Sequence, residues 1–560
     1  RISYCAIRIT HDRAGESYFM NREWYLSFFV FHYTLSAKRY TLSFKKRINN
    51  MADYLVGTDI GTGGTKSVLI DGEGNVLGSH YIEYPLIIPR PGWAEHNPEW
   101  YWNAVADTIK ASIKESRVSS KYIKAVSISA LSPACILVDK NLNPLQNAHI
   151  WMDRRATNEC QWLKENIGED VIFELTGNII DPYYATSKLM WEKNNRPHLY
   201  KETYKLQTAA DYPVAKLTGK ALTDYSNASL IGIAFDIVNR RWDEKMIEKI
   251  GLDVNKFPQA YPCDQVIGEV TREAGRETGL APGTPVVAGT VDYNAASLAM
   301  GVIDEGDNSL VMGTGGVWGV VHNKPDFTKN LVTIIPTAYS RQKYTTTATL
   351  ACCAALMKYF RDTFGQAEQT TEKQLGVSAY EIMNLEAEKV AAGSDGLIIL
   401  PYLMGERAPI WDPLARGVFF GLSLAHKRGH IIRAMMESVG YAVLHNVELA
   451  KQSEISINPP LFLGEGGAQS SLWRQIISDI LNEECVYIKE SRGAPLGNAI
   501  NAGVGVGIFK DYHIIKDWLT ITDEIKPNPK LHQLHNRMYR IYRELYPALK
   551  KYYKELAQIN

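Results

Sequence analysis

The tetrapeptide Gly-Thr-Gly-Gly occurs twice in this 560-residue chain, at residues 61–64 and again at residues 313–316. Each copy lies between two short apolar runs rich in β-branched residues, a pattern that predicts a strand, a tight turn and a second strand. Glycines let backbone N–H groups approach an anion closely, and a threonine hydroxyl adds a further donor. We expect the two turns to hold phosphate groups from two sides, although a plain β-turn explains either copy alone.

The candidate phosphate contacts come from both turns. In the first turn they are Thr62, Gly63 and Lys66, and in the second turn they are Thr314 and Gly315. A lysine on the outgoing strand is equally typical of a solvated surface position, so Lys66 has two interpretations.

A third glycine-rich segment, residues 463–473, passes from an apolar run into a helical pattern. Free N–H groups and the positive end of a helix favour a polar ligand. We therefore expect Gly466, Gly467 and Ser471 to contact the nucleoside part of a nucleotide. Close packing of a strand against a helix also selects glycine, and this alternative stays open.

Two aspartates follow apolar strand patterns. Asp292 ends the run 286–291, where a carboxylate beside a cleft could accept a proton from a substrate hydroxyl. A helix N-cap is its structural alternative. Asp59 precedes the first turn, and Mg²⁺ prefers hard oxygen ligands while keeping several waters. Asp59 is therefore the candidate magnesium ligand, through water, with turn stabilisation as the alternative.

The segment Trp151-Met152-Asp153-Arg154-Arg155 combines an aromatic ring with one acid and two bases. An aromatic face can pack on the C–H surface of a sugar while an acid binds its hydroxyls. Trp151 and Asp153 are therefore candidate substrate contacts, and a structural cluster at a domain edge is equally plausible.

Composition narrows the function. Lys+Arg and Asp+Glu both number 61, so net charge gives no support for nucleic-acid or membrane-surface binding. The seven cysteines form no Cys-x-x-Cys pair, as is typical of reduced thiols in a cytoplasmic protein. Neither a Gly-x-x-x-x-Gly-Lys-Ser/Thr loop nor a Gly-x-Gly-x-x-Gly turn occurs, so neither P-loop nor dinucleotide chemistry is indicated.

The length suits two domains, and the alternation of strand and helix patterns predicts an α/β fold. We expect one domain over 51–305, for sugar and phosphate binding, and a second over 306–560, for nucleotide binding. Residues 1–50 are rich in aromatic and basic residues without periodicity. We expect them to be a leader outside the enzyme, with Met51 as its start.

Two segments carry a family resemblance. Residues 417–422 and 430–437 resemble the C-terminal signature of the FGGY carbohydrate kinases throughout. The N-terminal signature is matched in part by Tyr183 and by the run 188–191, but Ala185 stands where Pro, Ser or Thr is usual. The loop 400–409 also resembles a loop of this family, and within it the chain is most similar to xylulokinases.

The resemblance implies two ribonuclease-H-like domains of the actin-like ATPase type, with ATP, Mg²⁺ and a small sugar in the cleft between them. It implies that Asp292 is the catalytic base and that Trp151 and Tyr183 line the sugar site. Ser132 and Tyr293 complete the expected substrate contacts. Many relatives form dimers, so a homodimer is implied by the resemblance alone.

One departure concerns the substrate. Typical xylulokinases carry a Met-His pair after the strand that ends near Ser129, and this chain has Ser132-Pro133. We expect D-xylulose as the leading substrate, with another ketopentose, glycerol, erythritol or gluconate as alternatives. An actin-like ATPase switch and a sugar-binding regulator without turnover are the competing functions.

Overall fold

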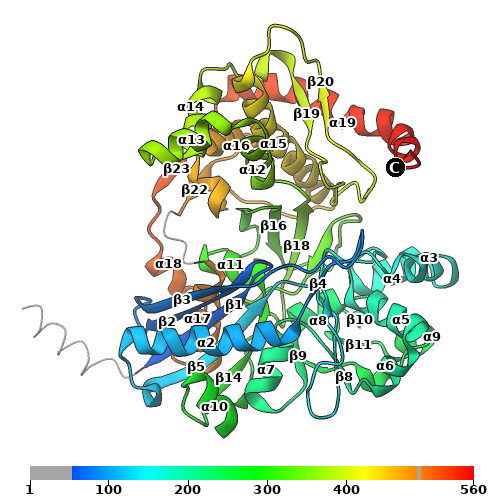
Figure 1. Ribbon diagram of the computed structural model, residues 1–560, viewed down its shortest axis with the longest axis vertical. Coiled ribbons are helices and arrows are strands. Elements are labelled where there is room, and N and C mark those ends of the chain that lie inside the picture. Colours follow the sequence, from blue (N-terminus) through cyan, green and yellow to red (C-terminus); the bar gives the residue numbers. More distant parts are fainter. Residues whose placement is uncertain (1–52, 489–492, 560) are drawn as a thin grey trace, which may run out of the picture. The chain divides into compact units, whose positions relative to one another are not determined.

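The computed structural model describes residues 53–488 and 493–559, which form a mixed α/β structure around two large sheets (Figure 1). The first sheet has the strand order β13-β14-β5-β1-β2-β3. Its strands are β1 Tyr54–Ile60, β2 Gly64–Asp71, β3 Val76–Glu83, β5 Ile123–Ala130, β13 Val266–Glu269 and β14 Pro285–Val291. The second sheet has the order β17-β18-β16-β15-β21-β22-β23. Its strands are β15 Asn308–Met312, β16 Gly316–His322, β17 Val332–Ile334, β18 Tyr344–Leu350, β21 Leu461–Gly464, β22 Cys485–Tyr487 and β23 Asp523–Ile525.

Two helices cover opposite faces of the first sheet. Helix α2, Pro98–Ser116, packs on the face that carries Val56, and helix α17, Gly493–Gly505, packs on the face that carries Leu55. Adjacent strand residues point to opposite faces, so the unbroken apolar run of β1 predicts cover on both sides. At Gly57 an added Cβ would lie 1.9 Å from the Pro495 carbonyl oxygen, so only glycine lets α17 approach β1.

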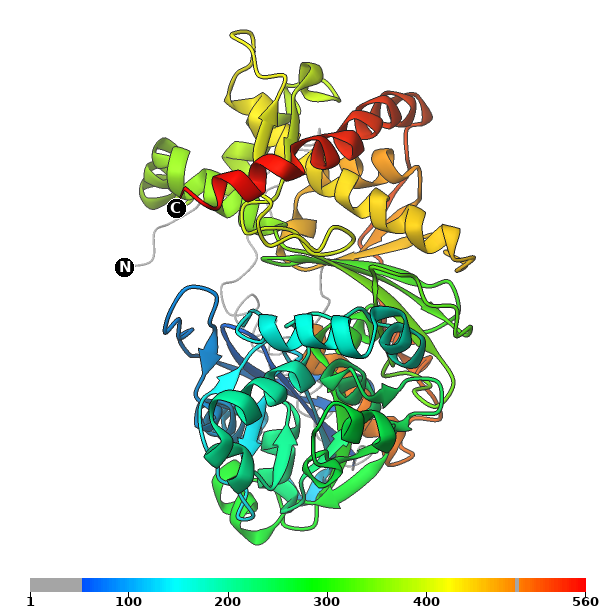
Figure 2. The same ribbon diagram turned by 90° about the vertical axis from the view of Figure 1, so that its right-hand side faces the viewer.

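The second sheet packs one face against the largest apolar core. Five of the described helices contribute to that core: α12 Ala354–Phe364, α14 Ala379–Glu388, α15 Arg428–Gln452, α16 Ser471–Leu481 and α19 Pro529–Leu556. Figure 2 shows α15 and α19 on the side of this sheet away from the first one. The fully buried Trp318 on β16 anchors the contact from within the sheet.

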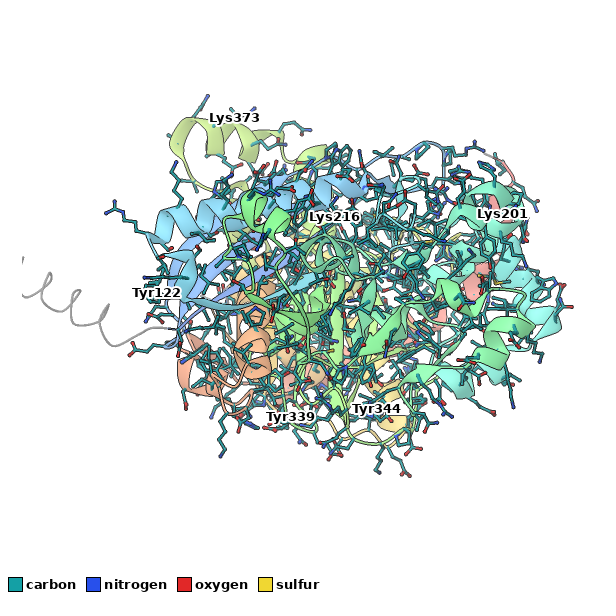
Figure 3. The ribbon with its side chains drawn as sticks, turned by 90° about the horizontal axis from the view of Figure 1, so that it is seen from below. Tyr122, Lys201, Lys216, Tyr339, Tyr344 and Lys373 are labelled. Carbon is teal, nitrogen blue, oxygen red and sulfur yellow. The ribbon has the colours of Figure 1, made fainter. Side chains whose placement is uncertain are left out.

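Smaller elements complete the described residues. Between β3 and β15 lie β4 Glu95–His96, η1 Ser120–Tyr122, β6 Ile136–Val138, β7 Ala148–His149, α3 Thr157–Asn166, α4 Glu169–Thr176, α5 Ala185–Asn195, α6 Pro197–Glu202, β8 Lys205–Gln207, α7 Asp211–Thr218, β9 Leu222–Asp224, α8 Tyr225–Ile231, β10 Phe235–Asp236, β11 Arg241–Trp242, α9 Glu244–Lys249, η2 Val254–Lys256, β12 Gln259–Tyr261, α10 Arg272–Thr278 and α11 Asp292–Ala299. Later in the chain lie α13 Gln366–Leu375, α14 Ala379–Glu388, η3 Ser394–Gly396, β19 Ile398–Leu400, β20 Val418–Phe420, η4 Gly466–Gln469 and α18 Ile514–Trp518. Seen from below, Tyr122 of η1 and Lys201 of α6 lie toward opposite sides of the described structure (Figure 3).

The structure confirms the expected fold class and both strand–turn–strand units. Helix α2 begins after Asn97, whose side-chain oxygen accepts from the Glu99 N–H at 3.0 Å with Pro98 in the first turn. The expected leader 1–50 lies outside the described residues. Packing of α17 on the first sheet means that a late segment of the chain completes the earlier core, while the boundary near Gly306 stays a prediction. In the described part of the chain, no helix is long and apolar enough to cross a membrane.

Candidate active site

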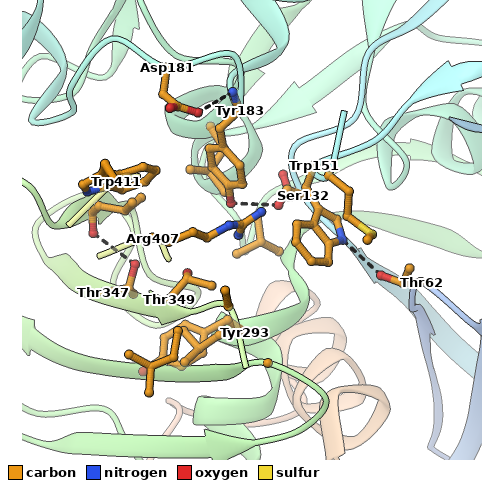
Figure 4. Close-up of a pocket in the computed structure, with 18 of the residues that line it drawn as sticks. Thr62, Ser132, Trp151, Asp181, Tyr183, Tyr293, Thr347, Thr349, Arg407 and Trp411 are labelled. Atoms are coloured by element: carbon orange, nitrogen blue, oxygen red, sulfur yellow. Dashed lines mark hydrogen bonds between the residues drawn. The ribbon is translucent and has the colours of Figure 1, made fainter. Parts of the chain in front are cut away.

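A cavity of about 330 Å³ is lined by residues from both sheets and their connecting loops (Figure 4). It brings together seven residues that the sequence singled out: Thr62, Ser132, Trp151, Tyr183, Asp292, Tyr293 and Gly315. The volume lies at the lower end of the range typical of small-molecule sites. Segments separated by more than two hundred residues therefore form one pocket.

Asp292 is the first residue of α11, directly after the buried strand β14. The N-cap position belongs to Val291, and the Asp292 carboxylate accepts a hydrogen bond from the Tyr293 N–H at 2.7 Å. Burial raises the pKa of Asp292 to about 6, against which that hydrogen bond acts. A partly exposed carboxylate with a raised pKa, facing a pocket, has the properties of a general base at neutral pH.

Asp59 lies near the end of β1, opposite Lys66 on β2 and Ser129 on β5. The Ser129 hydroxyl donates to its carboxylate, and Asn498 of α17 donates in turn to that hydroxyl at 2.7 Å. Burial, together with the charge of Asp292, raises the pKa of Asp59 to about 7. The two carboxylates are thus close enough to repel each other, an arrangement that a cation would relieve.

One wall of the pocket is aromatic. The Trp151 indole N–H donates to the Thr62 hydroxyl at 3.1 Å, which ties the ring to the first glycine turn. The Tyr183 hydroxyl donates to the Ser132 carbonyl oxygen at 3.0 Å. The Ser132 hydroxyl donates to the Asn227 side-chain oxygen at 3.1 Å. Figure 4 shows Trp151, Tyr183 and Ser132 around the same space.

The second glycine turn is held by backbone groups. The Thr314 carbonyl oxygen accepts from the N–H groups of Cys353 at 3.0 Å and Ala355 at 3.1 Å. An added Cβ at Gly315 would lie 2.9 Å from the Leu350 carbonyl oxygen, so close packing explains this glycine. Gly315 lines the pocket, whereas Thr314 is exposed beside it.

The third glycine-rich segment combines both interpretations that the sequence left open. A Cβ at Gly466 would meet nothing within 4 Å, so the backbone there is open to a ligand. A Cβ at Gly467 would lie 2.9 Å from the Met312 side chain, so that glycine permits packing on β15. Ser471 begins α16, and its neighbour Ser470 caps the helix by accepting from the Trp473 N–H.

Several predicted contacts lie outside the pocket lining. Gly63 and Lys66 are exposed on the first hairpin. The fully buried Asp153 carboxylate accepts from the Arg155 side chain and from the Ala94 N–H at 2.7 Å. Because its oxygens bind protein groups, we do not include Asp153 among the proposed sugar contacts.

The pocket also contains charged residues that the sequence did not single out as contacts. Arg154 forms a two-pronged ion pair with Asp181, and Glu406 and Arg407 come from the loop after β19. The sequence indicates this loop only through its family resemblance. A Glu-Arg pair between glycine and an Ala-Pro step was the available signal, but its position in the fold was not readable.

Glu406 and Arg407 have different partners. One Glu406 carboxylate oxygen accepts from the N–H groups of Ala351 and Arg407, both at 2.8 Å, and burial raises the pKa of Glu406 to about 7. The Arg407 guanidinium lies 4.3 Å from the Trp151 ring centroid and 5.1 Å from that of Tyr183. Burial lowers the pKa of Arg407.

Comparison with known proteins identifies both halves of the structure. Residues 54–299 match the N-terminal domain of the FGGY family of carbohydrate kinases, and residues 308–506 match its C-terminal domain.

Individual relatives carry different substrate names. A gluconokinase of Bacillus subtilis (strain 168) is 30% identical over 508 residues, covering 90% of this chain and 98% of that protein. A xylulose kinase of the same strain is 28% identical, covering 89% of this chain and 97% of that one. The crystal structure of a xylulose kinase from Rhodospirillum rubrum has 26% identity and a TM-score of 0.80, covering 90% of this chain and all of that one.

Proposed function

The chain belongs to the FGGY family of carbohydrate kinases and is an ATP-dependent sugar kinase, and we propose that Asp292 is the base of its reaction. The observation that carries this assignment is the position of Asp292, a pocket-lining carboxylate whose pKa is raised to about 6. A general base is most effective when its pKa lies near the working pH.

In the proposed reaction, a substrate hydroxyl attacks the γ-phosphorus of ATP while its proton passes to the Asp292 carboxylate. A bond forms between the hydroxyl oxygen and phosphorus, the bond from phosphorus to the β–γ bridging oxygen breaks, and ADP leaves. Because the transition state of phosphoryl transfer is loose, positioning of the two reactants contributes more than the base.

The glycine segments are proposed to hold the nucleotide. Thr62, Gly63 and Lys66 of the first turn and Thr314 and Gly315 of the second would donate to phosphate oxygens. In the third segment, the open backbone at Gly466 supports a nucleoside contact, with Gly467 and Ser471 beside it.

Magnesium is the proposed counterion of the phosphates, and the residues present fit it. Asp59 supplies a carboxylate of raised pKa, and the charges of Asp292 and Glu465 both raise that pKa further. A divalent cation would neutralise phosphate charge and lower this repulsion. No group of three or more metal-ligating side chains occurs in the described ranges.

Two substrates lead the proposal. D-xylulose is the sequence-based preference, and gluconate is the substrate named for a relative of similar identity. Ser132 occupies the position where this chain differs from the xylulokinase pattern. Its hydroxyl donates to Asn227, and its carbonyl oxygen accepts from Tyr183. Ser132 therefore shapes the wall of the pocket through its neighbours, and the rings of Trp151 and Tyr183 provide the packing surface for a sugar.

The test is a coupled assay of ADP release with ATP and magnesium. The acceptors are D-xylulose, L-xylulose, D-ribulose, L-ribulose, glycerol, erythritol and gluconate. Acceptor-dependent ADP release that disappears in Asp292→Asn supports the proposal. ATP hydrolysis that is indifferent to every acceptor would instead favour an ATPase switch.

A further inference from the structure

We propose that the preferred acceptor is a sugar acid and that Arg407 binds its carboxylate group. The inference rests on the proposed function, since it assigns the acceptor of the same phosphoryl transfer. It is carried by a contrast between the two arginines that line the pocket, Arg154 and Arg407.

Arg154 is neutralised within the protein. Both of its terminal nitrogens donate to Asp181, one to each carboxylate oxygen, and the second of these bonds is 2.7 Å long. Such a bidentate pair satisfies the charge and the geometry of both groups. Arg154 therefore has little charge left to offer a substrate.

Arg407 has no such partner. Among the residues that the structure describes, no carboxylate forms an ion pair with its guanidinium, which contacts two aromatic rings instead. Asp181 is engaged by Arg154, and Glu406 accepts two backbone N–H groups through one oxygen, while its other, buried oxygen has no hydrogen-bond partner among the described residues. Figure 4 shows the guanidinium extending into the space between Tyr183 and Trp151.

A guanidinium that is largely enclosed without a counterion is unfavourable, and burial lowers the pKa of Arg407 for this reason. The two rings hold the group by cation–π contact but accept no N–H···O bonds from it. An oxyanion in the pocket would supply both the missing charge and the acceptors, and a carboxylate matches the planar guanidinium in a bidentate manner.

Two oxyanions enter a sugar kinase, the phosphate of ATP and any acid group of the acceptor. The side chains around Arg407 favour the acceptor. Its neighbours are the rings of Trp151 and Tyr183, which offer packing surfaces suited to carbon chains, whereas the glycine turns supply N–H donors for phosphate. A sugar acid would place its carboxylate on Arg407 and a hydroxyl at Asp292.

Matched pairs of acceptors test this inference on the wild-type enzyme. Each pair has one sugar acid and the uncharged polyol of the same configuration: D-gluconate and D-glucitol, D-galactonate and galactitol, D-xylonate and xylitol. D-xylulose is assayed beside them. We expect one sugar acid to give the highest kcat/KM, about 10- to 100-fold above its polyol, as expected for charge-assisted hydrogen bonds.

The variant Arg407→Gln should remove this discrimination. Its KM for the preferred acid should rise about 10- to 100-fold, while the KM of the paired polyol and that of ATP stay within about twofold. Calorimetric titration of the acid without ATP should show the same loss of affinity. Arg416→Gln is the matched control, because Arg416 is an exposed arginine of the same loop that donates only to backbone carbonyl oxygens.

The outcomes separate this inference from the proposed function. If D-xylulose or a polyol is the best acceptor of the wild-type enzyme, the sugar-acid assignment is wrong while the kinase assignment stands. If Arg407→Gln raises the KM of ATP, or affects acids and polyols equally, Arg407 serves phosphate or structure. Absence of acceptor-dependent ADP release across both panels would overturn the proposed function itself.

Discussion

The two Gly-Thr-Gly-Gly turns share four residues and close in different registers. In the first hairpin Ile60 pairs with Thr65, and the Gly61 N–H bonds the Gly64 carbonyl at 2.8 Å, so two residues form the loop. In the second hairpin Met312 pairs with Gly316, which leaves three residues in the loop. A shift of one residue turns the outgoing strand to its other face.

The surroundings of the turns differ as well. Asp59, two residues before the first turn, lies opposite Lys66, whereas Val311 at the same place before the second turn lies opposite Val317. The first hairpin thus carries a charged pair next to its turn and contributes Thr62 to the pocket lining, whereas the second contributes Gly315 and the apolar Val317. The same tetrapeptide sets a turn, and its neighbours decide what chemistry the turn supports.

Removing the proposed base, Asp292, should give the largest effect on turnover. Asp292→Asn should lower kcat by about 100- to 10,000-fold, the range for a general base, and leave the KM of ATP nearly unchanged. Steady-state ADP release with the best acceptor measures both constants. Asp107→Asn, an exposed acid on α2, is the control with expected wild-type rates. Near-normal turnover in Asp292→Asn would show that Asp292 is not the base.

Removing the Asp59 charge from the first hairpin should give the next largest effect, on the magnesium requirement. Asp59→Asn should raise the magnesium concentration needed for half-maximal activity by about 10- to 100-fold, as for residues that position a metal through water. A magnesium titration at saturating ATP and acceptor measures it. Val311→Ala is the companion change at the corresponding place in the second hairpin. An equal magnesium response of both variants would contradict the division of charge between the hairpins.

The pH profile should show the titration of Asp292. Burial raises the pKa of this carboxylate to about 6, and the base must be deprotonated to accept a proton. We therefore expect kcat/KM for the acceptor to fall below pH 6, approaching about tenfold per pH unit. Stopped assays across pH 4.5 to 8 in constant ionic strength test this. If the residual activity of Asp292→Asn shows the same fall in kcat/KM below pH 6, a group other than Asp292 causes that fall.

The smallest effects should come from the threonines of the turns. Thr62→Ala removes both the acceptor of the Trp151 indole bond and a proposed phosphate donor, so the KM values of the sugar and of ATP should each rise about fivefold, equivalent to about 1 kcal/mol. Thr314→Ala removes a hydroxyl beside the second turn and should change the KM of ATP rather than that of the sugar. Initial-rate measurements give both constants, and a sugar KM that changes in Thr314→Ala but not in Thr62→Ala would contradict these assignments.

Local sequence patterns predicted many of the candidate site residues. Glycine at close approaches, apolar β-branched runs and an aspartate at the end of a strand each have a local physical meaning, and these led to Asp59, Thr62 and Asp292. The pairing of Asp153 with Arg155 was not readable, because burial depends on which segments pack nearby. Arg407 was missed for the same reason, since its lack of a counterion is a property of its surroundings.

The sequence by itself determined the α/β class, the two glycine hairpins and the family, since these depend on short-range patterns of residue type. Only the tertiary structure decided the register of each hairpin, the packing of α17 on the first sheet and the convergence of Asp292 with Arg407 in one pocket. These features depend on contacts between residues far apart in the chain. Packing, burial and electrostatic interaction act through space, so residue order alone does not specify them.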